Sequence, residues 1–266
     1  MRYPSFLLLA LAIIMGWLTA CDNIGQDERL IYVKPVSADR NVLIEDFTGQ
    51  RCVNCPNATD EIERLKAEYG ADAVIAVGIH SGPFAKSVRG VPYSLFTEDG
   101  DEYFNYWKVE SQPKGVVDRS GTSDYTSWGT IVRNELSKKA PLSLEVQCNY
   151  DAAVRQVDID VTSMGTDGHT TGHLQVWLLE DGITAFQYMP DGSINREYVH
   201  NHVFRCAVNG TWGTTYSVEE GATRQEHFQY LLDEEWVPEH MSVVVFVYND
   251  QGVCQVTQCP VIRSEE

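Results

Sequence analysis

The sequence predicts an α/β domain followed by an all-β antiparallel domain, with a boundary near Pro141. Before Pro141, continuous apolar runs are separated by amphipathic stretches with helical spacing, which is typical of strands covered by helices. After Pro141, apolar and polar residues alternate with a period of two, and turn signals separate the short runs. The chain of 266 residues is long enough for both domains.

The first predicted domain covers residues 41–140 and begins with a buried strand over residues 41–47. An amphipathic helix that starts at Cys55 follows, and Gly70 ends it. The apolar run 73–79 predicts a second buried strand, so these elements form a βαβ unit with parallel strands. The later elements are a helix in the second half of 94–108, a strand over 112–119 and a closing helix over 125–139.

The second predicted domain covers residues 141–266 and consists of short strands with turns between them. Alternation and β-forming residues predict strands over 142–148, 157–161, 174–176, 202–208, 224–231, 242–248 and 253–261. Such a series of short strands indicates an antiparallel β-sandwich.

A CxxC motif, Cys52-Val53-Asn54-Cys55, lies between the first strand and its helix. The order strand, CxxC and helix is that of the redox face of a thioredoxin-like domain. The complete prediction is therefore an α/β thioredoxin-like domain followed by an all-β antiparallel sandwich domain. The helix N-terminus favours a thiolate at Cys52, the predicted nucleophile, and Cys55 is the predicted resolving thiol. Zinc would require two more ligands at suitable spacing, so neither a metal nor a cofactor is predicted.

Two further residues complete the predicted catalytic set. Asp46 lies six residues before Cys52, and thioredoxins use a buried carboxylate at this spacing as a proton acceptor for the resolving cysteine. Glu45 beside it is the alternative carboxylate, and an acidic residue at a strand end without a role is the other interpretation. Pro113 precedes a strand of the same domain, where thioredoxin-like proteins place a cis-proline that docks substrate.

Arg51 and His80 are predicted auxiliary residues. Arg51, directly before the first cysteine, adds positive charge that favours the thiolate. His80 follows the second strand, at the edge of the sheet that should also carry the CxxC motif. A structural hydrogen bond is the favoured role of His80, and tuning of the Cys52 thiolate is the alternative. His200 and His202 would share one face of a strand, but without a clear third ligand we favour packing over a metal pair.

Residues 1–20 are predicted to be a lipoprotein signal peptide. Their apolar run is shorter than the roughly 20 residues that a transmembrane helix needs. The run ends in Leu18-Thr19-Ala20-Cys21, which resembles the bacterial lipobox, so we predict lipidation of Cys21 and membrane attachment through that lipid. An ordinary signal peptide is the alternative, and the polar residues 21–40 are predicted to be a tether.

The charge and the remaining cysteines limit partners and compartment. The formal net charge of −18 argues against nucleic-acid binding, which needs clustered basic residues. Besides the predicted lipidated cysteine and the CxxC motif, an even number of cysteines remains, which is consistent with disulfide bonds in an oxidising compartment. Their pairing stays open, and they are Cys148, Cys206, Cys254 and Cys259.

Several stretches resemble one known family. Val42–Asn57 is similar to the signature of the outer-membrane-protein-28-related lipoproteins of Bacteroidetes, and the resemblance extends to Tyr198–Arg205, Gly210–Gly213 and Asn249-Asp250. The resemblance implies a thioredoxin-like domain with a C-terminal β-sandwich, anchored at the outer membrane. It implies no settled activity.

Two functions of different classes are consistent with these residues. The first is thiol–disulfide exchange on the thiols or disulfides of exported proteins. The alternative is a non-catalytic surface lipoprotein, in which the CxxC forms a structural disulfide and the β-sandwich binds a partner or a glycan. The reduction potential of the cysteine pair separates the two functions.

Overall fold

The computed structural model of the protein describes residues 38–86 and 94–263. The predicted signal peptide, the lipidation site Cys21 and most of the predicted tether lie outside these residues. The described residues group into one compact unit. The described part contains four α-helices and sixteen β-strands, and none of its helices is long and apolar enough to cross a membrane.

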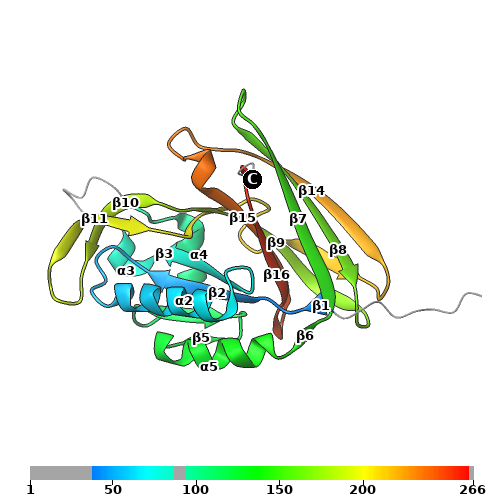
Figure 1. The fold of residues 1–266 in the computed structure, drawn as a ribbon, viewed down its shortest axis with the longest axis horizontal. Coiled ribbons are helices and arrows are strands. Elements are labelled where there is room, and N and C mark those ends of the chain that lie inside the picture. The colour runs from blue at the N-terminus through cyan, green and yellow to red at the C-terminus, as the bar shows by residue number, and fades with distance from the viewer. Residues whose placement is uncertain (1–37, 87–93, 264–266) are drawn as a thin grey trace, which may run out of the picture. The chain divides into compact units, whose positions relative to one another are not determined.

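One large mixed sheet runs through both halves of the sequence (Figure 1). Its strand order is β16-β15-β9-β12-β3-β2-β4-β5, and β13 also pairs with β9. The strands β2 and β3 are parallel, and β12 adds to β3 in the same direction. The strand bounds are β2 Val42–Thr48, β3 Val74–His80, β4 Lys114–Val117, β5 Thr122–Ser123, β9 Thr170–Glu180, β12 Val203–Ala207, β13 Thr214–Val218, β15 Met241–Asn249 and β16 Gly252–Pro260.

The predicted fold class is wrong. The structure is mostly β, and it shows no clear α/β thioredoxin-like domain followed by a separate sandwich. Val203 of β12 pairs with Gly78 of β3, so strands from beyond Pro141 extend the sheet that begins at Val42. The physical reason lies in β9 and β15, which are buried on both faces over most of their length and therefore serve as central strands of a mixed sheet.

A second, three-stranded antiparallel sheet packs against β9 and β15. It has the order β14-β8-β7, with bounds β14 Thr223–Leu231, β8 Gln156–Gly165 and β7 Leu142–Asp151. One core cluster joins Leu174 and Val176 of β9 to Val157 and Ile159 of β8. Two short pairs complete the β structure: β1 Ala38–Asp39 with β6 Lys139–Ala140, and β10 Ile183–Tyr188 with β11 Ile194–His200.

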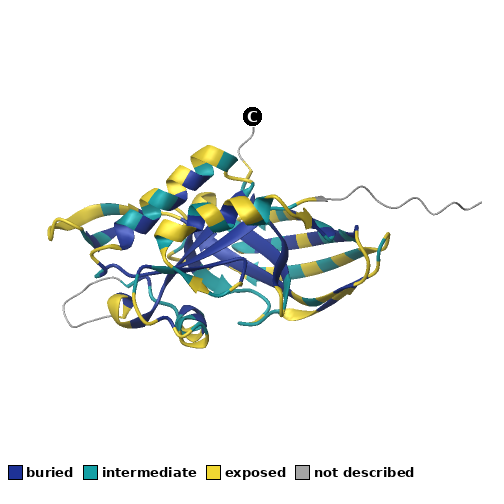
Figure 2. Ribbon diagram, turned by 90° about the horizontal axis from the view of Figure 1, so that it is seen from below, coloured by how far each residue is buried: buried dark blue, intermediate teal, exposed yellow. Residues whose placement is uncertain are grey.

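Helices cover both faces of the β2–β3 part of the large sheet. On one face, α2 (Cys55–Tyr69) and α5 (Tyr125–Leu136) bury Ile62, Leu65 and Trp128 against the strands. On the other face, α4 (Glu98–Tyr106) buries Tyr103, and α3 (Gly82–Ala85) follows β3. In Figure 2 the strands between these layers are dark blue, whereas the outward sides of the helices are yellow.

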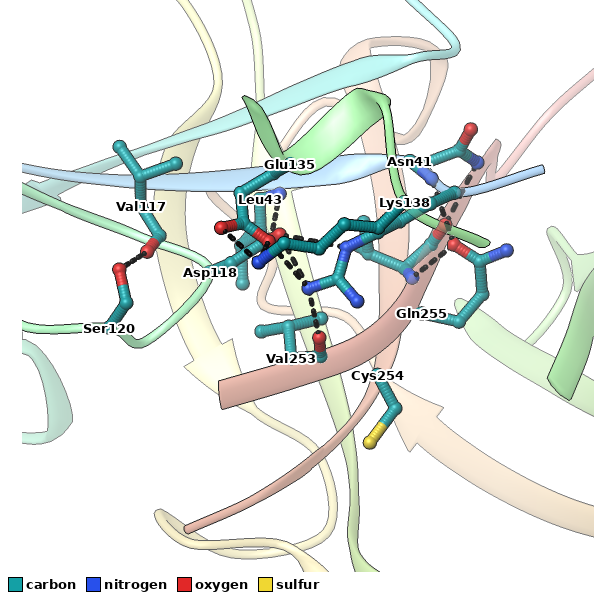
Figure 3. A network of polar contacts seen from close by, with 12 residues as sticks. Asn41, Leu43, Val117, Asp118, Ser120, Glu135, Lys138, Val253, Cys254 and Gln255 are labelled. Atoms are coloured by element: carbon teal, nitrogen blue, oxygen red, sulfur yellow. Dashed lines mark hydrogen bonds and ion pairs between the residues drawn. The ribbon is translucent and has the colours of Figure 1, made fainter. Parts of the chain in front are cut away.

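A polar network ties the beginning of β2 to distant segments of the chain (Figure 3). The Asp118 carboxylate accepts hydrogen bonds from the Leu43 N–H at 2.8 Å and from the Arg40 guanidinium at 2.9 Å. Arg40 also donates to the Val253 carbonyl at 2.6 Å, and the Asn41 N–H donates to the Gln255 side chain at 3.0 Å. These bonds join the start of β2, the β4–β5 turn and β16, so they tie the two halves of the sequence to each other.

We expect a disulfide bond between Cys148 of β7 and Cys259 of β16 in the protein from an oxidising compartment. Their sulfur atoms lie 2.6 Å apart, close to the bond length of about 2.05 Å. Peptide mapping without reductant should find the two cysteine peptides linked, while Cys206 and Cys254 react with iodoacetamide after denaturation. Alkylation of all four cysteines under these conditions would contradict the pairing.

Candidate functional site

The two cysteines of the CxxC motif are joined by a disulfide bond, with Cα atoms 5.4 Å apart. Cys55 is the first residue of α2, and Pro56 lies in the first turn, where its missing N–H leaves no bond unmade. The Cys52 N–H donates to the Gly49 carbonyl at 2.9 Å, so a tight turn links the end of β2 to the helix. The pair therefore lies at the positive end of the helix dipole, which favours a thiolate once the bond is reduced.

The segment of α3 packs against this turn. A Cβ atom at Gly49 would lie 2.7 Å from the carbonyl carbon of Phe84, so only glycine permits this approach. The Arg51 N–H donates to the Phe84 carbonyl at 3.2 Å, and its guanidinium donates to two further backbone carbonyls, those of Pro83 and Lys86. Arg51 thus fixes the turn to α3, and its effect on the first thiol stays a prediction.

The β10–β11 hairpin lies against the CxxC turn, and both sulfur-bearing residues are buried. Cys52 is 3% exposed and Cys55 is 2% exposed. The Gln187 side-chain amide donates to the Cys52 carbonyl at 2.9 Å, and the Tyr188 N–H donates to the Gln50 carbonyl at 2.8 Å. Sequence reasoning missed this hairpin, which brings a segment from beyond residue 180 onto the cysteine pair.

Asp46 is the carboxyl group on the disulfide side of the sheet. Side chains alternate along β2, so Asp46 lies on the α2 side with Ile44, whereas Glu45 lies on the opposite side. Burial raises the pKa of Asp46 to about 8, and its Oδ1 atom has no hydrogen-bond partner among the described residues. Asp46 and Cys55 line a shared cavity of about 20 Å³, which has room for about one water molecule. A carboxyl group that is mostly protonated at neutral pH thus lines the same small cavity as the second cysteine.

Three histidines border the same cavity: His80 from β3, and His200 and His202 from the end of β11 and the residues after it. The rings of His80 and His200 meet edge to face at 5.2 Å. Burial lowers the pKa of His80 well below its usual value, and the neighbouring His200 adds to the shift. Burial also lowers the pKa of His200 to about 4 and that of His202 to about 3. All three are therefore neutral at pH 7, and the described residues contain no group of three potential ligands that could hold a metal ion.

Pro113 lies at the edge of the sheet where the CxxC turn begins. The Gln112–Pro113 peptide bond is cis, which is the geometry expected from the sequence. The Gln112 side chain donates to the carbonyls of Thr48 at 2.7 Å and Ser81 at 3.1 Å, so this segment is bonded to the ends of β2 and β3. Contact between Pro113 and a substrate chain stays a prediction.

Comparisons with known proteins agree with the family expected from the sequence. The model of a family described as Outer membrane protein Omp28 matches residues 100–264. Among solved structures, HBP35 of Porphyromonas gingivalis has a TM-score of 0.66 at 15% identity, over 85% of this chain and 77% of that chain, which is a likeness of fold. A domain of the outer membrane lipoprotein Omp28 from Porphyromonas gingivalis has a TM-score of 0.35 at 24% identity, over 46% of this chain and 88% of that chain. A search of curated proteins found no match. Because the family model covers more than half of the sequence, the chain belongs to the Omp28 family of outer membrane proteins, which places it at the outer membrane.

Proposed function

We propose that the protein carries out thiol–disulfide exchange on exported proteins, with the Cys52–Cys55 pair as the reacting group and a lipid on Cys21 as the membrane anchor. In the reduced form, the Cys52 thiolate attacks a substrate disulfide and releases one substrate thiolate. The Cys55 thiol then loses its proton and attacks the mixed disulfide, which releases the second substrate thiolate. The substrate gains two electrons, and the cysteine pair becomes the disulfide seen in the structure.

The observation that carries this proposal is the buried carboxyl group of Asp46, which lines the same small cavity as Cys55. Burying an ionisable group whose Oδ1 atom has no hydrogen-bond partner among the described residues destabilises a protein, and a purely structural disulfide has no use for such a group. A group with a pKa near 8 can accept the Cys55 proton during the resolving step and release it to solvent afterwards. The helix N-terminus at Cys55 also supports exchange at this position.

A second candidate function follows from the burial of both cysteines. A disulfide that is covered by the β10–β11 hairpin is protected from thiols in solution, as a structural bond would be. Exchange requires the contacts of Gln187 to open so that a substrate sulfur can reach Cys52. The alternative of a structural disulfide requires no such opening.

The reduction potential of Cys52–Cys55 distinguishes the two functions. We expect a value between about −120 and −270 mV, the range of exchange catalysts, whereas structural bridges lie below about −300 mV. Equilibration of the full chain with glutathione buffers, followed by alkylation and mass spectrometry of the two cysteines, gives this value. A potential far below −300 mV would exclude exchange catalysis.

We also expect Cys55→Ser to accumulate mixed disulfides with exported proteins through Cys52, because the resolving thiol is missing. Cys52→Ser is the matched control, since it keeps one thiol in the motif but lacks the attacking one. Non-reducing electrophoresis of cell-envelope extracts should show adducts for the first variant and none for the second. Equal patterns for both variants would contradict the assigned roles.

A further inference from the structure

An open hollow of about 1040 Å³ lies where the end of α4 meets the β4–β5 and β15–β16 turns. Aromatic rings and one arginine make up much of its wall: Tyr106, Trp107, His173, Trp212, Tyr248 and Arg119. This hollow and the cysteine pair lie on opposite faces of the sheet. Asp46 of β2 lies on the α2 face with the cysteines, whereas its neighbour Glu45 lies on the other face, where it pairs with Arg119. The volume suits a ligand of two or three rings.

The floor of this aromatic pocket is held rigidly by a buried cation. The guanidinium carbon of Arg119 lies 4.0 Å from the ring centre of Tyr248 and 4.8 Å from that of Phe246. Its Nε atom donates to Glu45 at 2.9 Å, and both side chains are almost fully buried. Asp118 and Arg119 have φ angles of 48° and 55°, in the left-handed region that is unusual for residues other than glycine. Such backbone strain persists where the surrounding structure enforces it, often at binding sites.

The rim of the pocket presents aromatic rings to solvent. Tyr106 is 59% exposed, and its ring centre lies 4.6 Å from that of Trp212. Trp212 is fixed by a hydrogen bond from its Nε1 atom to Glu102 at 2.7 Å, and its carbonyl accepts a bond from the Tyr248 hydroxyl at 2.7 Å. Preorganised aromatic surface that stays in contact with water is typical of a ligand site.

The polar groups around these rings indicate the class of ligand. Amide and carboxylate side chains of Asn105, Gln251 and Asp250 lie in the wall and are exposed. Arg119, the cation of the wall, is paired with Glu45, and the carboxylates of Glu102 and Asp250 also line the pocket, so the wall has no net positive charge to attract an anionic ligand. Amides and carboxylates supply donors and acceptors for hydroxyl groups, and flat rings pack against the apolar C–H faces of sugar rings.

We propose that this aromatic pocket binds a neutral oligosaccharide of two or three pyranose units. Tyr106 and Trp212 stack on sugar faces, while the amides and the carboxylate of the wall bond to the hydroxyl groups. Such a site would give the outer-membrane protein a glycan-binding surface on the opposite face of the sheet from its cysteine pair.

The test measures binding of neutral oligosaccharides built from glucose, mannose, galactose or N-acetylglucosamine to the purified full chain, by calorimetry and tryptophan fluorescence. We expect at least one to bind with a Kd of about 1 mM or tighter, and Tyr106→Ala to weaken it about tenfold. Phe84→Ala removes an aromatic side chain that is 40% exposed outside the pocket, and it should leave binding unchanged, as should Cys52→Ser. Failure of every sugar to bind in a Tyr106-dependent manner would overturn the proposal. Tighter Tyr106-dependent binding of a proline-rich peptide or of a sulfated oligosaccharide would also overturn it.

Discussion

Asp46→Asn is expected to stabilise the oxidised protein while slowing its disulfide exchange. The pKa of Asp46 is raised from 3.8 to about 8 in the folded protein. Between these two pH values the folded state keeps the proton on Asp46, whereas the unfolded state has released it. Stability is therefore greatest at low pH and falls as the pH rises from about 4 to about 8. Asparagine has no ionised form. At pH 7 the free energy of unfolding of the variant should therefore exceed that of the parent protein by about 2–4 kcal/mol. Urea unfolding of both proteins between pH 4 and pH 9 measures the difference.

In the proposed exchange reaction, the same substitution removes the proton acceptor for the resolving thiol. Loss of a positioned acid or base slows a reaction by roughly 10²–10⁴-fold, and stopped-flow kinetics with a disulfide substrate should show this loss in the Cys55 step. Asp60→Asn is the matched control, because Asp60 is an exposed carboxylate on α2, the helix that begins at Cys55. An Asp46→Asn protein that resolves mixed disulfides at the parent rate would remove Asp46 from the mechanism. A parent protein with unchanged stability across this pH range would show that the carboxyl is not buried as described.

The location of the cysteine site was predictable from local sequence signals. A β-strand, a CxxC motif and an amphipathic helix follow one another within thirty residues, and the helix begins at Cys55 as expected. The choice between Glu45 and Asp46 needed the structure, because both residues adjoin the strand end. Strand alternation then decides it: Asp46 lies on the α2 side of the sheet and Glu45 lies opposite.

The connection between the two halves was missed because it depends on pairings between distant strands. The run Val243–Val247 is apolar at every position, which is typical of a strand covered on both faces and not of the outer sheet of a sandwich. The β10–β11 hairpin also left a local signal, the Asp191-Gly192 turn between two runs of β-forming residues. Neither signal shows that β12 pairs with β3 or that the hairpin reaches Cys52, since both contacts join segments more than 120 residues apart.

Glu45→Gln is expected to destabilise the fold by about 3–5 kcal/mol, because it leaves the charge of Arg119 buried without its partner. Glu45 is fully buried, and its Oε1 atom accepts from Arg119 at 2.9 Å. Burial lowers the pKa of Arg119, but the charge of Glu45, the neighbouring Tyr248 and Tyr103 side chains and the hydrogen bond to Glu45 together raise it overall. The loss should appear in urea unfolding at pH 7. Glu68→Gln is the control, since the Arg64–Glu68 pair is 50% and 41% exposed, and its removal should change stability by less than about 0.5 kcal/mol.

The double variant Glu45→Leu/Arg119→Met tests the cause of this loss. If the cost in Glu45→Gln comes from an uncompensated buried charge, removing both charges should recover most of the stability, because apolar side chains of similar volume pack in place of a buried ion pair. The aromatic rings around Arg119 would then lose their cation, so sugar binding should weaken in the double variant even where stability is restored. A double variant as unstable as Glu45→Gln would instead mean that the pair holds the left-handed turn at Asp118 and Arg119 in place through its hydrogen-bond geometry.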